Sequence, residues 1–221
     1  KKQTYKNFEH IIIDGGSKPN VLNIIKKNEQ NIDIWVSAKD NGIYDAINKG
    51  IKMSSGDIIG ILNADDVYFP KTLEIAKNYF NNKKIDFLFG TVIKDRLLHG
   101  FWPDKIWWKF NIYPAHSCGF FVKRIIHKKV GLYDTKFKFS SDRDFIFKLI
   151  KKNYKGLCTN KKEIFGKFNT KGISSQISYF RTIFEEFHIR LNHKQNIVYL
   201  FFLLILTLLN KLYNFIFKGL R

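Results

Sequence analysis

Short apolar runs that alternate with helix-like segments constrain the fold of this chain more than any other feature. The continuous apolar runs predict buried strands at 11–13, 32–36, 58–62, 85–89 and 117–122. Apolar spacing predicts helices at 19–28, 42–53, 71–80 and 141–151. Strands that alternate with helices in this way indicate an α/β fold with a largely parallel sheet.

Acidic loops follow two of the predicted strands. Asp14 follows the first, and Asp65 and Asp66 follow the strand at 58–62. In such sheets, ligands bind beside the carboxyl ends of the strands. We therefore expect the three carboxylates to converge on one rim around a shared cleft. Carboxylate oxygens suit a hard divalent cation, which can hold a diphosphate and neutralise the charge that builds on it as it departs.

Three segments resemble signature motifs of the family 2 glycosyltransferases, which have the GT-A fold. They are Asp-Gly-Gly-Ser at 14–17, the stretch from Asp40 to Gly50, and Gly-Ile-Leu-Asn-Ala-Asp-Asp at 60–66. The resemblance covers roughly residues 3–174 and is closest to bacterial enzymes that build surface polysaccharides. It implies a GT-A catalytic domain at 1–178. Because the chain opens on Lys1, and the family usually begins with a strand and a base-contacting loop, we expect an amino-terminal piece to be missing.

The resemblance implies a nucleotide-sugar donor, with a UDP-sugar as the first choice. Asp14 matches the acid that contacts the nucleotide base, and Asp40 matches a second position on the nucleotide side. Asn48 falls on a helix that faces the donor in the family, although it could also cap the helix or pack.

The resemblance also implies a divalent metal, Mn²⁺ or Mg²⁺. Asp66 matches the metal-binding acid of the family's DxD-type motif, and Asp65 beside it is expected to help hold the metal or the ribose. Asn63 stands where the first acid of that motif usually lies, so its ribose contact would be neutral and weaker.

An acid that opens the predicted helix at 141–151 matches the catalytic base of the family. Asp142 is our first choice for this base, and Asp144 is the alternative. Helical spacing points the two about 200° apart, so only one of them can face the cleft. Asp142 could instead be an ordinary first-turn acid that the helix dipole favours. The implied reaction is a single displacement with inversion at the anomeric carbon, in which the base lies within hydrogen-bond reach of the attacking hydroxyl.

Three further features have both a functional and a structural interpretation. His116 could contact the acceptor or the diphosphate, or could be a satisfied structural histidine. The loop 171–174 could close over the diphosphate, although small polar loops are common. Three tryptophans could stack on acceptor sugars, dip into lipid or pack in the core: Trp102, Trp107 and Trp108.

The carboxyl-terminal segment 179–221 is predicted to be helical and membrane-associating. Lys194 and Lys211 bound an uncharged stretch of sixteen residues, whereas a full span needs about 20. We expect a basic, aromatic-rich helix at the lipid interface. A short transmembrane helix and a core or dimer helix are the alternatives. The membrane association would place the protein at the cytoplasmic face of the cell membrane, beside a saccharide or lipid-linked saccharide acceptor.

The charge of the chain leaves two other classes of function to weigh. With 38 Lys and Arg against 19 Asp and Glu, the net charge is +19, which favours an anionic partner. The composition of an AT-rich genome could also produce much of this surplus. A nucleic-acid-binding module is one rival class, but the sequence has no RNP-like or helix-turn-helix signature, so we expect no nucleic acid partner. The other rival is an inactive, membrane-bound fragment with a structural role.

Overall fold

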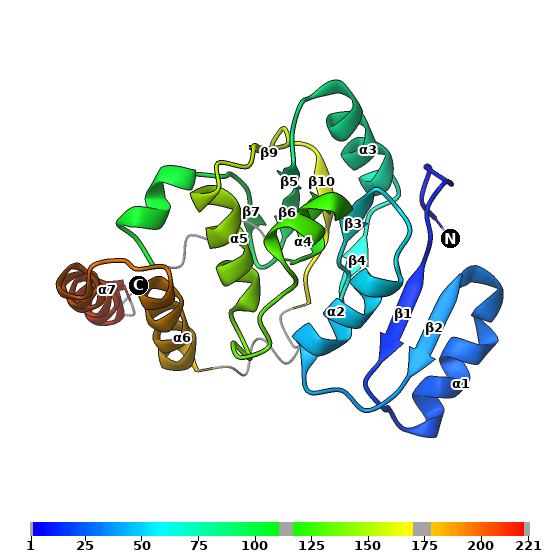
Figure 1. Ribbon diagram of the computed structural model, residues 1–221, viewed down its shortest axis with the longest axis horizontal. Helices are drawn as coiled ribbons and strands as arrows, with labels where there is room; N and C mark the ends of the chain where they lie inside the picture. Colours follow the sequence, from blue (N-terminus) through cyan, green and yellow to red (C-terminus); the bar gives the residue numbers. More distant parts are fainter. Residues whose placement is uncertain (1, 111–116, 170–177, 219–221) are drawn as a thin grey trace.

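The computed structural model describes residues 2–110, 117–169 and 178–218. The first half of this chain alternates strands and helices (Figure 1): β1 (Ile11–Asp14), α1 (Pro19–Lys27), β2 (Ile34–Ser37), α2 (Ile43–Met53), β3 (Ile58–Gly60), β4 (Val67–Tyr68), α3 (Thr72–Asn82), β5 (Phe87–Phe89), β6 (Thr91–Ile93) and β7 (Leu97–Leu98). The second half contains β8 (Phe120–Lys123), α4 (Arg124–Val130), α5 (Ser141–Lys151), β9 (Gly156–Cys158), β10 (Ile164–Lys167), α6 (Tyr179–Asn192) and α7 (Ile197–Lys218). The α/β class predicted from the sequence is confirmed.

The strand pairing is mixed rather than largely parallel. Within the described residues the strands form three sheets, ordered β1-β2, β4-β10-β6-β7 and β3-β8-β5-β9. Three pairings are parallel, β1 with β2, β6 with β10 and β5 with β9, and four are antiparallel. The difference arises because β8, which comes after the long middle segment, inserts antiparallel between β3 and β5.

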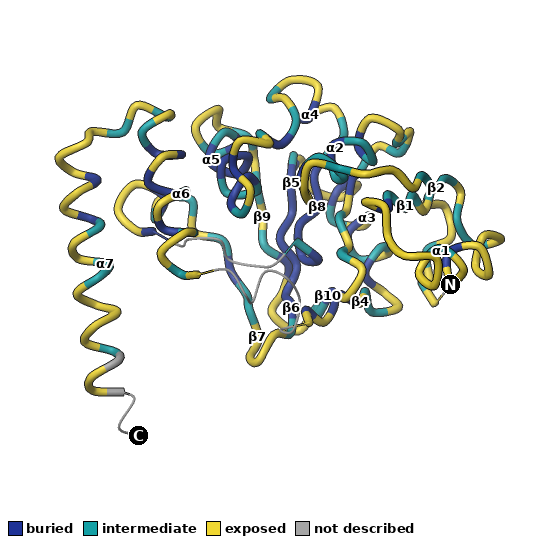
Figure 2. Tube along the Cα trace, turned by 90° about the horizontal axis from the view of Figure 1, so that it is seen from below, coloured by how far each residue is buried: buried dark blue, intermediate teal, exposed yellow. Residues whose placement is uncertain are grey.

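The β3-β8-β5-β9 sheet is the centre of the core. Along β5, Phe87 and Phe89 face one side and Leu88 faces the other, as the period of two in a strand requires. One face packs on α5 through Phe145 and Leu149, which are fully buried. The other face packs on α3. Figure 2 shows the buried trace running through β5, β8 and part of α5.

The β1-β2 unit joins this core through α2 and a side chain that precedes β1. Glu9 accepts hydrogen bonds from the backbone N–H groups of Ser55 and Gly56, both at 2.6 Å. This contact ties the start of β1 to the turn before β3. Gly50 brings α2 against Ile13 of β1. The loops that follow β1 and β2 are thereby held close to the start of α2 (Figure 1).

Helices α6 and α7 pack against each other beside the α/β core, and they cross, since Figure 1 shows α7 end-on and α6 from the side. Leu200 and Leu203 of α7 pack on Ile183 and Phe187 of α6. Arg190 of α6 is fully buried, and its guanidinium donates hydrogen bonds to the backbone carbonyls of Ile106 and Lys109. The opposite face of α7 is apolar and exposed over most of its length (Figure 2).

Candidate functional site

Asp14, at the end of β1, is held as a charged group by its own loop. Its Oδ2 accepts hydrogen bonds from the N–H of Gly16 at 3.1 Å, the N–H of Ser17 at 3.0 Å and the hydroxyl of Ser37 at 2.7 Å. Burial raises the pKa of Asp14, but the hydrogen bonds from Ser17, Ser37 and the backbone outweigh it and lower the pKa to about 2. Asp14 is therefore an ionised acceptor at neutral pH.

Asp40 lies beside the Asp14 loop. A Cβ on Gly15 would collide with the Asp40 carboxylate, so the backbone after Asp14 passes directly against this side chain. Asp40 Oδ1 also accepts the N–H of Gly42 at 2.9 Å. Gly42 has a φ of 112° and precedes α2, a conformation that favours glycine. The structure thus brings together the two acids that were predicted on the nucleotide side.

Asn48 has a packing role, which is one of the alternatives that the sequence left open. Its Nδ2 donates to the Tyr133 carbonyl at 2.8 Å, and its Oδ1 accepts the Tyr133 N–H at 3.0 Å. The residue is only 8% exposed. Its amide fastens α2 to the chain after α4, and the expectation that Asn48 lies on a helix that faces the donor stays a prediction.

Asp66 belongs to a second polar cluster, in the loop after β3. Asn63 Nδ2 donates to Asp66 Oδ2 at 3.2 Å and to Ser117 Oγ at 3.1 Å. Asp66 Oδ1 accepts the N–H of Asn169 at 3.1 Å. Asn63 therefore orients the Asp66 carboxylate, and the neutral ribose contact expected of Asn63 stays a prediction. Sequence reasoning missed Ser117 and Asn169, since neither belongs to a motif and both are distant along the chain.

The electrostatics of Asp66 are the reverse of those of Asp14. Asp66 is 6% exposed, and burial, with a further contribution from the charge of Asp65, raises its pKa to about 6. Asp65 itself is exposed. No group of three or more His, Cys, Asp or Glu side chains is arranged for a metal among the described residues. Two carboxylates nevertheless suit Mg²⁺, which commonly takes one or two of them together with substrate phosphates and water.

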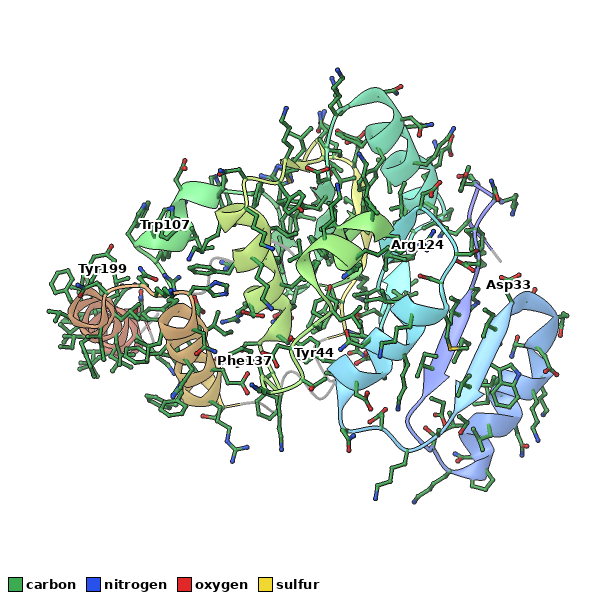
Figure 3. All side chains as sticks on the ribbon, in the orientation of Figure 1. Asp33, Tyr44, Trp107, Arg124, Phe137 and Tyr199 are labelled. Atoms are coloured by element: carbon green, nitrogen blue, oxygen red, sulfur yellow. The ribbon has the colours of Figure 1, made fainter. Side chains whose placement is uncertain are left out.

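Asp142 lies in the first turn of α5 and meets α2. The Tyr44 hydroxyl donates to Asp142 Oδ1 at 3.0 Å, and the N–H of Arg143 donates to the same oxygen at 2.9 Å. Burial raises the pKa of Asp142 against the lowering effects of the Arg143 charge and the Tyr44 hydrogen bond. Figure 3 shows Tyr44 between the start of α2 and the start of α5.

Asp144, the alternative base, faces away from this contact. It is 3% exposed and pairs with Lys148 at 2.6 Å and with His193 at 2.8 Å. These partners lower its pKa even though burial raises it. The 200° separation expected from helical spacing therefore holds: Asp142 points toward α2, and Asp144 points toward the start of the α6–α7 turn.

The remaining sequence candidates have mixed outcomes. His116 and the loop 171–174 lie outside the described residues. Three tryptophans are 45–53% exposed, so full burial in the core does not account for them: Trp102, Trp107 and Trp108.

Helix α7 is 22 residues long, which exceeds the uncharged stretch predicted from the sequence. Its segment Ile197–Asn214 is long and apolar enough to cross a membrane. Only 11% of that stretch is buried within the described chain, and the interfacial, transmembrane and core or dimer interpretations of this helix stay predictions.

The described contacts arrange the candidate residues in two groups. One group runs from the Asp14 loop through Asp40 and the start of α2 to Asp142. The other group surrounds Asp66. Convergence of both groups on one cleft stays a prediction. Acids that follow the strands of an α/β domain are typical of enzymes that bind nucleotides at the carboxyl ends of those strands.

Comparison with known proteins identifies the family. The sequence model described as "Glycosyl transferase family 2" matches residues 1–205, and the chain belongs to this family. An uncharacterised glycosyltransferase of Rickettsia typhi is 30% identical over 164 residues, which cover 67% of this chain and 51% of the relative. A "PGL/p-HBAD biosynthesis glycosyltransferase" of Mycobacterium bovis is 30% identical over 153 residues, covering 65% and 59%. The chain thus spans about half the length of the first of these relatives.

Solved structures share the fold at low sequence identity. S. aureus TarS 1-349, in complex with UDP-GlcNAc, aligns with a TM-score of 0.62 and 15% identity, covering 98% of this chain and 66% of that one. The mannosyltransferase PcManGT from Pyrobaculum calidifontis, in complex with GDP-Man and Mn²⁺, aligns with a TM-score of 0.62 and 14% identity, covering 86% and 57%. These likenesses confirm a GT-A-type fold.

Proposed function

We propose that this chain carries the catalytic part of a metal-dependent, inverting glycosyltransferase. It moves a sugar from a nucleotide donor, most simply a UDP-sugar, to a saccharide or lipid-linked saccharide acceptor in surface polysaccharide synthesis. The observation that carries this proposal is the Asp142 carboxylate at the start of α5, hydrogen-bonded to the helix that begins beside the nucleotide-side acids.

Asp142 serves as the base in this proposal. Its Oδ1 is engaged by Tyr44 and Arg143, and the side chain is partly exposed. A partly buried carboxylate whose pKa is raised by burial is a better proton acceptor than a solvated one. It takes the proton of the acceptor hydroxyl while that oxygen attacks the anomeric carbon from the face opposite the departing diphosphate.

Asp65 and Asp66 would hold the divalent metal, and Asn63 would orient Asp66. The oxygen donor set fits Mn²⁺ or Mg²⁺, and Asp66 lies where a cation would relieve the cost of burying its charge beside Asp65. When bound, such an ion neutralises charge on the leaving nucleoside diphosphate. Asp14 and Asp40 would bind the nucleoside end of the donor, since both are positioned to accept its N–H and O–H groups.

Helix α7 would bring the protein to the cytoplasmic face of the membrane. Its exposed apolar residues include Phe201, Phe202 and Ile205, each more than half exposed. Lys211 and the other basic residues of this +19 chain add attraction to anionic lipid. These features support a lipid-linked acceptor.

Donor binding followed by transfer tests the proposal. Thermal unfolding is measured with a panel of nucleotide sugars, with and without Mn²⁺, and sugar transfer is then measured with the best donor. Asp142→Asn should keep the metal-dependent thermal shift and lower the transfer rate by about 100-fold or more. Asp95→Asn, which changes an exposed acid with no assigned role, is the matched control and should behave like the wild type.

Three outcomes would overturn the proposal. Normal transfer by Asp142→Asn would show that the base is another group. A failure of every nucleotide sugar to stabilise the chain would favour an inactive fragment. Tight, steeply salt-dependent binding of nucleic acid, with no response to nucleotide sugars, would favour a nucleic-acid-binding module.

A further inference from the structure

We propose that Tyr44 is a positioning residue, whose hydroxyl fixes the Asp142 carboxylate so that one chosen oxygen faces the acceptor, and that Asn48 and Tyr133 clamp Tyr44 in place. This inference rests on the proposed function, because it assigns Asp142 as the base. It adds Tyr44 and Asn48 of α2, which act through Asp142 rather than on the substrate.

The first step is that the two carboxylate oxygens of Asp142 have different hydrogen-bond partners. Tyr44 and the Arg143 N–H both donate to Oδ1 of Asp142, at 3.0 and 2.9 Å. Oδ2 accepts no hydrogen bond from the described residues, and it is not among their buried unsatisfied atoms. Two donors on one oxygen prevent the carboxylate from rotating freely. The accessible oxygen, Oδ2, is then the atom that accepts the proton.

The second step is the immobility of Tyr44 itself. Its side chain is 9% exposed, and its ring stacks on Tyr133 with centroids 5.7 Å apart and an interplanar angle of 25°. Asn48 lies one turn further along α2 and bonds to both backbone groups of Tyr133. Tyr133 in turn packs on Phe145 of α5, at 4.9 Å between centroids. The donor and the acceptor of the Tyr44–Asp142 bond are thus tied to one another through Tyr133.

The third step is the charge balance around Asp142. The charge of Arg143, from the same helix, lowers the pKa of Asp142, and Arg143 pairs with Glu186 of α6 at 2.8 Å. Burial and the Asp142 charge raise the pKa of Tyr44, so its hydroxyl keeps its proton and remains a donor. The Tyr44 bond lowers the pKa of Asp142 against the effect of burial. Removing the hydroxyl should therefore make Asp142 harder to ionise.

The test is Tyr44→Phe, which removes one oxygen and keeps the ring stacked on Tyr133. We expect kcat to fall about tenfold, with the KM for the donor unchanged. The acidic limb of the kcat profile should move to higher pH by about one unit. Tyr79→Phe is the matched control: it deletes a hydroxyl that donates to Glu163 at 2.7 Å, and it should move neither kcat nor the limb.

A second variant separates clamping from direct donation. Asn48→Ala keeps the Tyr44 hydroxyl but breaks both bonds to Tyr133. It should lower kcat and move the acidic limb less than Tyr44→Phe does. If Asn48→Ala moves the acidic limb as far as Tyr44→Phe does, Asn48 does more than hold Tyr44 in place, and the clamping part of the proposal is wrong.

A measurement that needs no activity keeps the inference separate from the proposed function. The carboxyl carbon of Asp142 is followed by ¹³C NMR against pH and assigned with Asp142→Asn. Tyr44→Phe should raise the midpoint of this titration. An unchanged midpoint, with an unchanged kcat profile, overturns the positioning role of Tyr44. A raised midpoint in a chain that transfers no sugar from any donor would instead overturn the proposed function while leaving the contact intact.

Discussion

Asp14 and Asp66 are both nearly closed to solvent, yet their electrostatics are opposite. Asp14 is 8% exposed and Asp66 is 6% exposed. Burial raises the pKa of both, yet the pKa of Asp14 ends at about 2 and that of Asp66 at about 6. Three donors from nearby residues converge on one oxygen of Asp14. At Asp66, burial outweighs the hydrogen bonds from Asn63 and Asn169, and the charge of the neighbouring Asp65 adds to its effect.

The difference teaches that burial alone does not decide what a carboxylate in this domain is suited to bind. The protein already stabilises the charge of Asp14, so this acid can accept a neutral N–H or O–H group. At Asp66 the charge is costly, and a cation would lower that cost. Two similar acids after two strands are thereby suited to two parts of one donor, the nucleoside and the metal-bound diphosphate.

The largest effect should come from removing the Asp66 charge. In Asp66→Asn, the Mn²⁺-dependent part of nucleotide-sugar binding should weaken by about 100-fold or more, because a metal ligand is lost. Asp14→Asn should weaken donor binding by about tenfold and leave its dependence on Mn²⁺ intact. Both are measured by titration calorimetry with and without the metal. Equal loss of metal dependence in the two variants would contradict the division between the loops.

A smaller effect is expected on the stability of the chain without ligands. Asp14→Asn keeps an acceptor in place but removes the charge that its donors stabilise, so the free energy of unfolding at pH 7 should fall, by at most about 2 kcal/mol because solvent screens part of this charge. The folded-state pKa of Asp14 is lowered, so this contribution is present above the usual pKa of 3.8 and is lost as the pH falls toward 2. Urea unfolding at pH 7 and pH 3 measures it.

Asp66→Asn is the control for this measurement, and its sign should differ. The pKa of Asp66 is raised above its usual value, so its charge destabilises the folded chain relative to the unfolded one at pH 7. Removing that charge should leave the free energy of unfolding unchanged or increase it. A loss as large as that of Asp14→Asn would mean that the two loops do not differ as their hydrogen bonds indicate.

Local patterns were sufficient to predict much of the fold. Helix α5 begins and ends at the residues that its apolar spacing predicted, Ser141 and Lys151, and α2 begins one residue later than expected. The same periodicity predicted that Asp142 and Asp144 would face different ways, as their partners Tyr44 and His193 confirm. These features depend on residues within one or two helical turns of one another.

Long-range pairing could not be predicted in the same way. The insertion of β8 between β3 and β5 gives an antiparallel centre that no alternation of strands and helices specifies. Contacts of the site also join distant segments: Tyr44 and Asp142 are 98 residues apart, and Asn63 and Ser117 are 54 apart. Their geometry depends on how the elements pack, which the motif spacing does not encode.

The smallest expected effect is the pH dependence of metal-assisted donor binding, and it separates the loops most cleanly. A proton competes with the metal for Asp66, whose pKa is about 6. Apparent Mn²⁺-dependent affinity should therefore fall about tenfold between pH 7 and pH 5, where only about a tenth of this carboxyl is ionised. Asp14, with a pKa of about 2, stays ionised over this range. Asp14→Asn should accordingly bind more weakly by the same factor at both pH values. A pH-independent affinity in the wild type would show that Asp66 is not the group that the metal needs.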